Sequence, residues 1–116
     1  MTKIDIAKVC HAANKIICEL NDDFSRKDWN DSEKWQTDSS ILGVEYIINN
    51  PNPSDSILHD SWSNERIAAG WKYGPIKDAN LKTHPCLVPF ESLPKFQQAK
   101  DALFAGICKS LIKYLD

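Results

Sequence analysis

Residues 59–94 read HDSWSNERIAAGWKYGPIKDANLKTHPCLVPFESLP, and this stretch decides how the rest of the chain is organised. It holds two of the four tryptophans, two of the three histidines, four of the six prolines and two of the four glycines. After a short helical run, the spacing of its apolar residues fits neither a helix nor a strand. A loop this rich in aromatic residues, proline and glycine is held in one shape, so it either binds a ligand or locks a small fold together.

The order of motifs in this stretch resembles the ryanodine receptor repeat, or RyR domain. The matching residues, in chain order, are His59-x-x-Trp62, Gly70-Trp71-x-Tyr73-Gly74, Asp78, His84-Pro85-x-Leu87-x-Pro89-Phe90 and Leu93-Pro94. On this resemblance, residues 57–94 form the core of the motif. Residues 1–50 resemble the amino-terminal half of small stand-alone versions found in bacteria and their phages.

The resemblance also implies a shape and a kind of ligand. The repeat is helical in this family, with a small extended element in the loop. Receptor copies come as tandem pairs, and the pair forms a cleft whose tryptophans hold an adenine nucleotide. Prokaryotic copies have been suggested to recognise nucleotide-derived signals. A lone copy either recreates the pair as a homodimer or covers its exposed face with amino-terminal helices.

The length of 116 residues predicts one domain, 1–116, with one core. Apolar residues make up 42% and charged residues 26%, which is typical of a soluble globular protein. The net charge of −2 gives no field that would attract a nucleic acid polymer, and no apolar run approaches the roughly 18 residues of a membrane span. No signal peptide and no Cys/His ligand spacing are recognisable. We therefore expect a cytoplasmic protein with reduced thiols, no metal and no cofactor.

Apolar periodicity and turn signals predict a mainly α fold with about four helices. The expected helices span 2–20, 32–49, 54–70 and 93–115. Ser54 is the expected amino-terminal cap of the third helix, and Gly70 its carboxy-terminal stop. Residues 71–90 are expected to be irregular, with at most a two-stranded pairing around Trp71–Tyr73 and Cys86–Val88.

The first helix and the loop after it carry further expectations. The apolar stripe of that helix is expected to run through Ile6, Val9, Ala13, Ile16, Ile17 and Leu20. This places His11 off the stripe, facing solvent. Cys10 and Cys18 lie near apolar faces, where a free cysteine behaves as a small hydrophobe. In the polar loop 21–31, Trp29 either plugs the edge of the core or overhangs a pocket.

The second predicted helix is apolar on most of its surface. Such a helix lies at the centre of a helical domain or is covered by a second subunit. Together with the paired habit of the family, this predicts a homodimer.

The third helix and the loop carry the candidate site. His59, Trp62 and Arg66 are spaced to share one helical face, and a turn at Gly70 can fold Trp71 back towards it. Tryptophan faces suit a purine, and a locally basic loop suits phosphate. The candidate ligand-binding residues are His59, Trp62, Arg66, Trp71, Lys72, Tyr73, Lys77, Asp78 and His84. In this scheme Asp78 contacts a ribose hydroxyl or an adenine amine.

Other interpretations of these residues remain open. Trp71 and Tyr73 can belong to the core, while His59 can bond a loop carbonyl and His84 can pin the loop. We expect a non-catalytic module that senses or sequesters an adenine- or ADP-ribose-type nucleotide. A protein–protein interaction module that uses the same aromatic loop is the alternative. We do not expect an enzyme, because no nucleophile–base pattern or paired carboxylates stand out.

Overall fold

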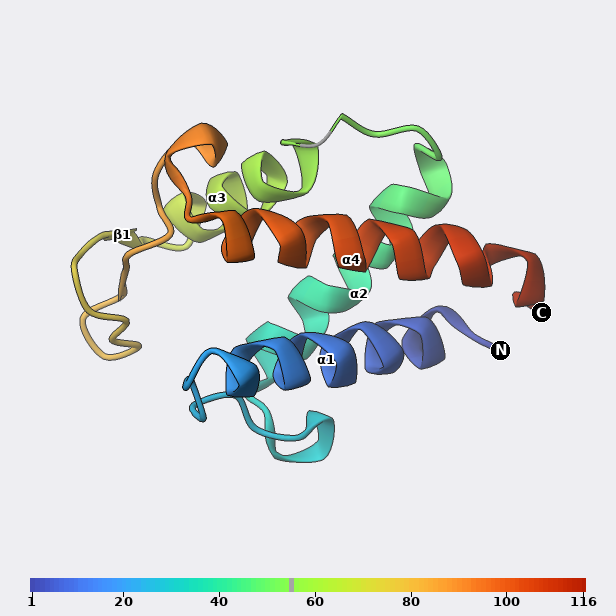
Figure 1. The fold of residues 1–116 in the computed structure, drawn as a ribbon, viewed down its shortest axis with the longest axis horizontal. Helices are drawn as coiled ribbons and strands as arrows, with labels where there is room; N and C mark the ends of the chain where they lie inside the picture. The colour runs from blue at the N-terminus through green and yellow to red at the C-terminus, as the bar shows by residue number, and fades with distance from the viewer. Residues whose placement is uncertain (55) are drawn as a thin grey trace.

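The computed structural model describes residues 1–54 and 56–116, and it is mainly helical, as the sequence predicts (Figure 1). The α-helices are α1 (Lys3–Leu20), α2 (Lys34–Asn49), α3 (Ile57–Ala68) and α4 (Lys95–Leu111). Short 3-10 turns are η1 (Trp29–Asp31), η2 (Phe90–Ser92) and η3 (Ile112–Tyr114). The strands β1 (Lys72–Tyr73) and β2 (Thr83–His84) have two residues each.

The start of α1 is fixed by its own sequence. The Thr2 hydroxyl accepts a hydrogen bond from the Asp5 amide, and the Asp5 carboxylate accepts one from the Thr2 amide. This capping box satisfies two backbone donors that the first helical turn leaves free. The bond from the Thr2 amide is the main reason that the pKa of Asp5 lies below its usual value.

Helix α3 begins later than predicted. Ser54 is not its cap, because the helix starts at Ile57 with Ser56 in the capping position, and the Ser56 side chain makes no capping bond. The Ser54 carbonyl instead closes a single turn by accepting from the Ile57 amide at 3.2 Å. Position 55, within the predicted helix, lies outside the described residues.

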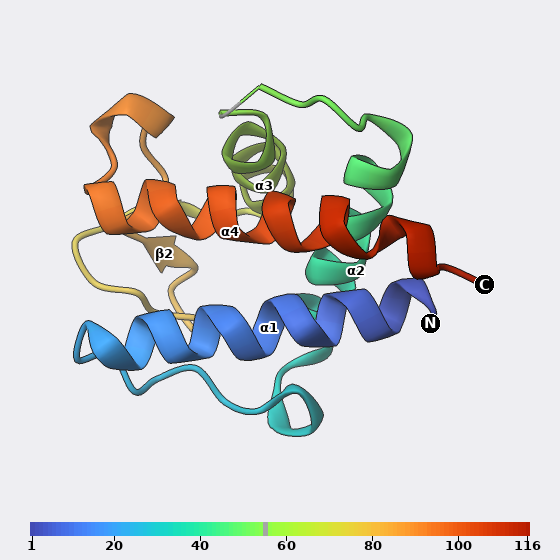
Figure 2. The ribbon, with the colours of Figure 1, turned by 45° about the vertical axis from the view of Figure 1, so that its right-hand side comes forward.

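Helices α1 and α4 lie side by side and antiparallel, with α2 packed against both (Figures 1 and 2). Val44 and Ile47 of α2 are thus buried within the chain, as expected of a central helix, whereas Leu42 remains 53% exposed. The two termini meet, because the Met1 ammonium lies 3.0 Å from the Asp116 carboxylate. Among the described residues, no helix is both long and apolar enough to cross a membrane.

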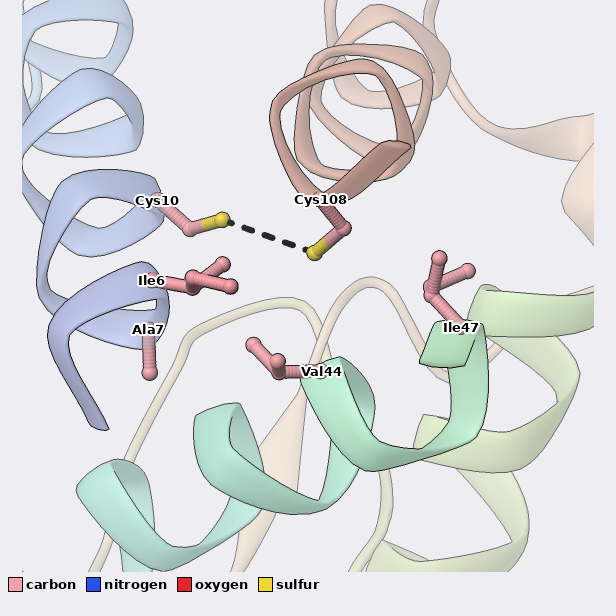
Figure 3. Packing of buried hydrophobic residues seen from close by; sticks show 6 residues of the cluster. All are labelled: Ile6, Ala7, Cys10, Val44, Ile47 and Cys108. Atoms are coloured by element: carbon pink, nitrogen blue, oxygen red, sulfur yellow. Dashed lines mark hydrogen bonds between the residues drawn. The ribbon is translucent and has the colours of Figure 1, made fainter. Parts of the chain in front are cut away.

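The core lies where α1, α2 and α4 meet (Figure 3). Its fully buried members are Ile6, Ala7, Cys10, Val44, Ile47 and Cys108. The Cys10 and Cys108 sulfurs are 3.9 Å apart across the α1–α4 contact, and both cysteines are free. Small side chains at these positions let the two helices approach closely.

The predicted stripe on α1 is wrong at three of its six positions. Val9, Ile16 and Leu20 are exposed, whereas His11, expected to face solvent, is buried; Cys18 is buried, as expected near an apolar face. Because α1 packs against two helices at once, its buried face is set by where α2 and α4 lie. The most hydrophobic stripe in the sequence of α1 is therefore not the stripe that is buried.

The loop forms the expected two-stranded pairing, but with a different second strand. Strand β1 pairs in parallel with β2, in the register Lys72 with Thr83 and Tyr73 with His84. The predicted partner, Cys86–Val88, is therefore wrong. The chain turns back early because the Asp78 and Thr83 backbones exchange two hydrogen bonds of 3.0 Å.

Candidate ligand cavity

One face of α3 carries His59, Trp62 and Arg66, as their spacing predicts. His59 is buried, and its Nε2–H donates to the Val88 carbonyl at 2.7 Å. The imidazole stacks on the Trp62 ring with 5.6 Å between ring centroids. His59 therefore ties the loop to α3, which is the structural role that the sequence left open, and it also holds Trp62 in place.

The turn after α3 brings Trp71 back to this face. Gly70 has φ +92°, a conformation that residues with a Cβ rarely adopt, and it lets the Trp71 amide donate to the Arg66 carbonyl at 2.9 Å. The Trp71 ring is buried and lies 5.5 Å from the Trp35 ring of α2. The Lys82 ammonium donates to the Ala69 carbonyl at 2.8 Å, where a cation complements the carboxy-terminal end of α3.

The Arg66 guanidinium lies between aromatic rings and one carboxylate. Its side chain is buried, its Nη2 is 2.7 Å from Glu65 Oε1, and its central carbon is 4.6 Å from the Trp35 ring centroid. This position gives a cation–π contact in a partly dry environment. Arg66 is therefore a fixed part of the wall and not a mobile charge at its rim.

His84 connects the two tryptophans. Its ring lies 4.9 Å from Trp62 and 6.4 Å from Trp71, and its Nδ1 accepts a hydrogen bond from the Cys86 amide at 3.0 Å. Burial, and then the charge of Lys77, lower the pKa of His84 to about 4. The ring is therefore neutral at physiological pH, and it pins the loop before Pro85 as an acceptor.

These side chains line a cavity of about 350 Å³ that α1–α4 and the loop enclose together. The volume lies within the range of small-molecule sites. Six of the nine candidate ligand-binding residues reach it: His59, Trp62, Arg66, Trp71, Lys77 and His84. Trp62 and Trp71 share it, as the proposed pocket required.

Three candidate residues lie outside the cavity lining. Lys72 and Tyr73 are exposed on β1, with 58% of Tyr73 accessible, so Tyr73 is not a core residue. The Asp78 carboxylate accepts hydrogen bonds from the Asn80 and Leu81 amides, so it shapes the turn. Ligand contacts by these three side chains stay untested, and the site proposed below does not include them.

His11 is the clearest error in the predicted environments. It is buried, and its Nε2 lies 2.6 Å from the Lys27 carbonyl oxygen, beside the edge of Trp29. Burial is the largest cause of its lowered pKa. His11 also lines the cavity, whereas Trp29 packs against the edge of the core.

The sequence reasoning missed several other residues that line the cavity. They are Asn14 of α1, Arg26 of the following loop, Trp35 of α2, and Gln97, Lys100 and Asp101 of α4. The one available signal was in α4, where Gln97, Lys100 and Asp101 share a helical face with Phe104. Polar residues on a face that also carries a large aromatic indicate a boundary between core and cavity.

Three cations gather on the wall near His84. Arg26, Lys77 and Lys100 all line the cavity, and Asp23 is the carboxylate beside them. Shielding from water, and then repulsion from Arg26, lower the pKa of Lys77, although its side chain remains partly open to solvent. This cluster carries more positive than negative charge and suits an anion.

The cavity wall also holds three buried polar atoms that lack a hydrogen-bond partner among the described residues. They are Asn14 Oδ1, Arg66 Nε and Asp101 Oδ2. Burial raises the pKa of Asp101 to about 6, and the charges of His59 and Lys100 oppose that rise. A buried polar atom without a partner costs free energy. The residues described thus leave three hydrogen-bonding atoms in this cavity that solvent or a polar ligand can satisfy.

The fold and the cavity define a small helical domain whose aromatic loop closes one cavity wall. A family model described as RyR domain matches residues 54–115, which is more than half of the chain. The chain belongs to the RyR domain family. The match covers α3, the loop and α4, so Trp62, Trp71 and Asp101 fall within it. Helix α1, the loop that carries Arg26, and helix α2 with Trp35 precede the matched residues. Side chains from these three segments line the rest of the cavity.

Proposed function

We propose that this domain binds an adenine- or ADP-ribose-type nucleotide in the cavity without turning it over, and so senses or sequesters it. The observation that carries the proposal is the composition of the cavity wall. Aromatic faces, a cation cluster and three unpaired polar atoms converge on one space. A nucleotide supplies a flat base, an anionic phosphate and several hydrogen-bonding groups, so it complements all three.

The base is proposed to stack on Trp62. This side chain is only partly buried, and His59 supports its ring from one side. Stacking of a base on an aromatic side chain stabilises a complex by roughly 1–3 kcal/mol. Trp71 is more deeply buried and also contacts Trp35, so its larger role is to form the wall behind the base.

The phosphate is proposed to meet Arg26, Lys77 and Lys100. These three residues come from a loop, the β1–β2 connection and α4, so no single local sequence run brings them together. His84 contacts both tryptophan rings, and the charges of Lys77 and Lys100 help to lower its pKa. We therefore place the base and phosphate positions next to each other in this cavity.

Binding without catalysis is supported by the state of the Cys86 thiol, which lies two residues after His84. His84 Nδ1 accepts from the Cys86 backbone amide, so that nitrogen is engaged with the main chain. Burial raises the pKa of the Cys86 thiol, which disfavours the nucleophilic thiolate.

A protein-interaction module is the second candidate, and one observation favours it. Strand β1 and the β1–β2 connection expose Tyr73, Ile76 and Leu81, with 58%, 74% and 69% of each residue accessible. These apolar side chains lie outside the cavity lining. A peptide that bound here would therefore use a different surface from the nucleotide.

The experiment is a titration of intrinsic tryptophan fluorescence, confirmed by calorimetry, with adenosine, AMP and ADP-ribose. Trp62→Ala is expected to abolish binding and to cost less stability than the roughly 3–5 kcal/mol of a fully buried aromatic. Tyr73→Ala is the control and is expected to bind normally. Retained affinity in folded Trp62→Ala protein would remove the proposed stacking site, whereas no nucleotide binding by the wild-type protein would leave the interaction module as the leading candidate.

Two lysines of the same loop provide a matched test of the phosphate position. Lys77→Ala is expected to weaken AMP and ADP-ribose, and to reduce the salt dependence of their binding, while adenosine is unaffected. Lys72→Ala removes the same charge five positions earlier, outside the cavity lining. It is expected to change neither the affinity for AMP and ADP-ribose nor the salt dependence of their binding. Equal losses from both variants would show that only the general charge of the loop matters.

A further inference from the structure

Of the three polar atoms in the cavity that lack a partner among the described residues, only the one in Asp101 belongs to a carboxylate. Asp101 lies on α4, lines the cavity, and has a buried Oδ2 that finds no hydrogen-bond partner in residues 1–54 and 56–116. Buried carboxyl oxygens are normally paired, because their desolvation is not otherwise compensated. The described residues supply no partner for this oxygen, so it is available to a donor from solvent or from a ligand.

The surroundings of Asp101 place it near the proposed base. Asp101 lines the same cavity as His59, Trp62 and Lys100, and His59 and Lys100 are the two residues that influence its pKa electrostatically. His59 stacks directly on Trp62, the proposed platform. The shared cavity makes the edge of a ring stacked on Trp62 a candidate partner for the carboxylate. A phosphate is disfavoured at this point because the two anions repel each other.

We infer that Asp101 selects the base by accepting a hydrogen bond from an exocyclic amine on the ring that stacks against Trp62. The inference rests on the proposed function and adds a specificity rule to it. A cavity whose acceptor is otherwise unpaired rejects a ligand without the donor, because that ligand leaves the oxygen buried and unsatisfied. Asp78, which the sequence favoured for contact with a ribose hydroxyl or an adenine amine, lies outside the cavity lining, and its Oδ1 accepts from the backbone of its own turn.

The test compares adenosine with purine riboside, which lacks only the 6-amino group. Wild-type protein is expected to prefer adenosine by roughly tenfold to a hundredfold, the usual effect of a hydrogen bond to a charged group. Asp101→Ala is expected to reduce that preference to near one, and Asp101→Asn, which keeps an acceptor, to retain part of it. Glu91→Ala is the control, because Glu91 is exposed and outside the cavity lining.

The outcomes separate this inference from the proposed function. If wild-type protein binds adenosine and purine riboside equally, the inference is wrong while nucleotide binding stands. If 2′-deoxyadenosine, but not purine riboside, binds weakly in an Asp101-dependent way, the carboxylate reads the sugar, and the inference is again wrong. If wild-type protein binds none of the nucleosides or nucleotides, both proposals fall. Circular dichroism of each variant establishes that it is folded.

Discussion

Replacing Asp101 with asparagine is expected to stabilise the ligand-free protein at neutral pH. Burial raises the pKa of this carboxyl from 3.8 to about 6, so ionising it costs more in the folded protein than in the unfolded chain. Between pH 4 and pH 6 the folded state holds the extra proton, and stability therefore falls as the pH rises through this window. Above pH 6 the full cost is present.

The magnitude follows from the size of the shift. Two pKa units at 1.36 kcal/mol each amount to about 3 kcal/mol at pH 7.5. Asparagine has nearly the same shape and carries no charge, and it breaks no bond at Oδ2, which has none among the described residues. For a chain of this length, the gain corresponds to a rise in Tm of roughly 10 °C.

The assay is urea denaturation followed by circular dichroism at pH 7.5 and at pH 4. Asp101→Asn is expected to be more stable than wild type at pH 7.5 and nearly equal to it at pH 4. Glu91→Gln, an exposed control, is expected to show little change at either pH. A variant that is no more stable at pH 7.5, or one whose gain is the same at both pH values, would refute the reasoning about a buried ionised carboxylate.

Three further predictions concern other parts of the molecule. Gly74→Ala is expected to lower the Tm, because a Cβ at position 74 would lie 2.6 Å from the Thr83 Cβ. Gly106→Ala is the control: no atom of the described residues lies within 4 Å of its added Cβ, so the protein is expected to become more stable by roughly 0.5–1 kcal/mol. Similar melting curves for the two variants would contradict the crowding at Gly74. Ellman's reagent is expected to label Cys86 first in the native protein, because Cys10, Cys18 and Cys108 are buried. After denaturation it is expected to label all four cysteines. Fast labelling of more than one thiol in the native protein would contradict this packing. Light scattering at micromolar concentration is expected to give twice the 13.2 kDa of the chain, and a monomer mass would remove the predicted homodimer.

The parts of the site that sequence reasoning found are those built from local spacing. His59, Trp62 and Arg66 share a face because a helix repeats every 3.6 residues, and Gly70 returns Trp71 to that face because glycine accepts a positive φ. Asp78 has a local role that spacing alone did not reveal. Its Oδ1 accepts from amides two and three residues ahead and so shapes the turn, while a ligand contact by Asp78 remains a prediction.

The strand partner of β1 shows where local reasoning ends. Both Thr83–His84 and Cys86–Val88 follow a turn signal, and either can pair with Lys72–Tyr73 on propensity alone. The close approach of Gly74 to Thr83, and the bridge between Asp78 and Thr83, decide between them. Strand propensity describes each residue by itself, so it does not predict contacts between residues that lie several positions apart.

By itself the sequence determined the mainly helical fold, the capped start of α1, the shared face of α3 and the family motif. Each of these depends on residues within a few positions of one another, where backbone geometry alone fixes the outcome. Only the tertiary structure decided that His11 is buried, and that Arg26, Trp35 and Asp101 meet one cavity. The reason is physical: burial and pKa depend on which elements pack together. That packing is set by all the helices at once, so no single stretch of sequence determines it.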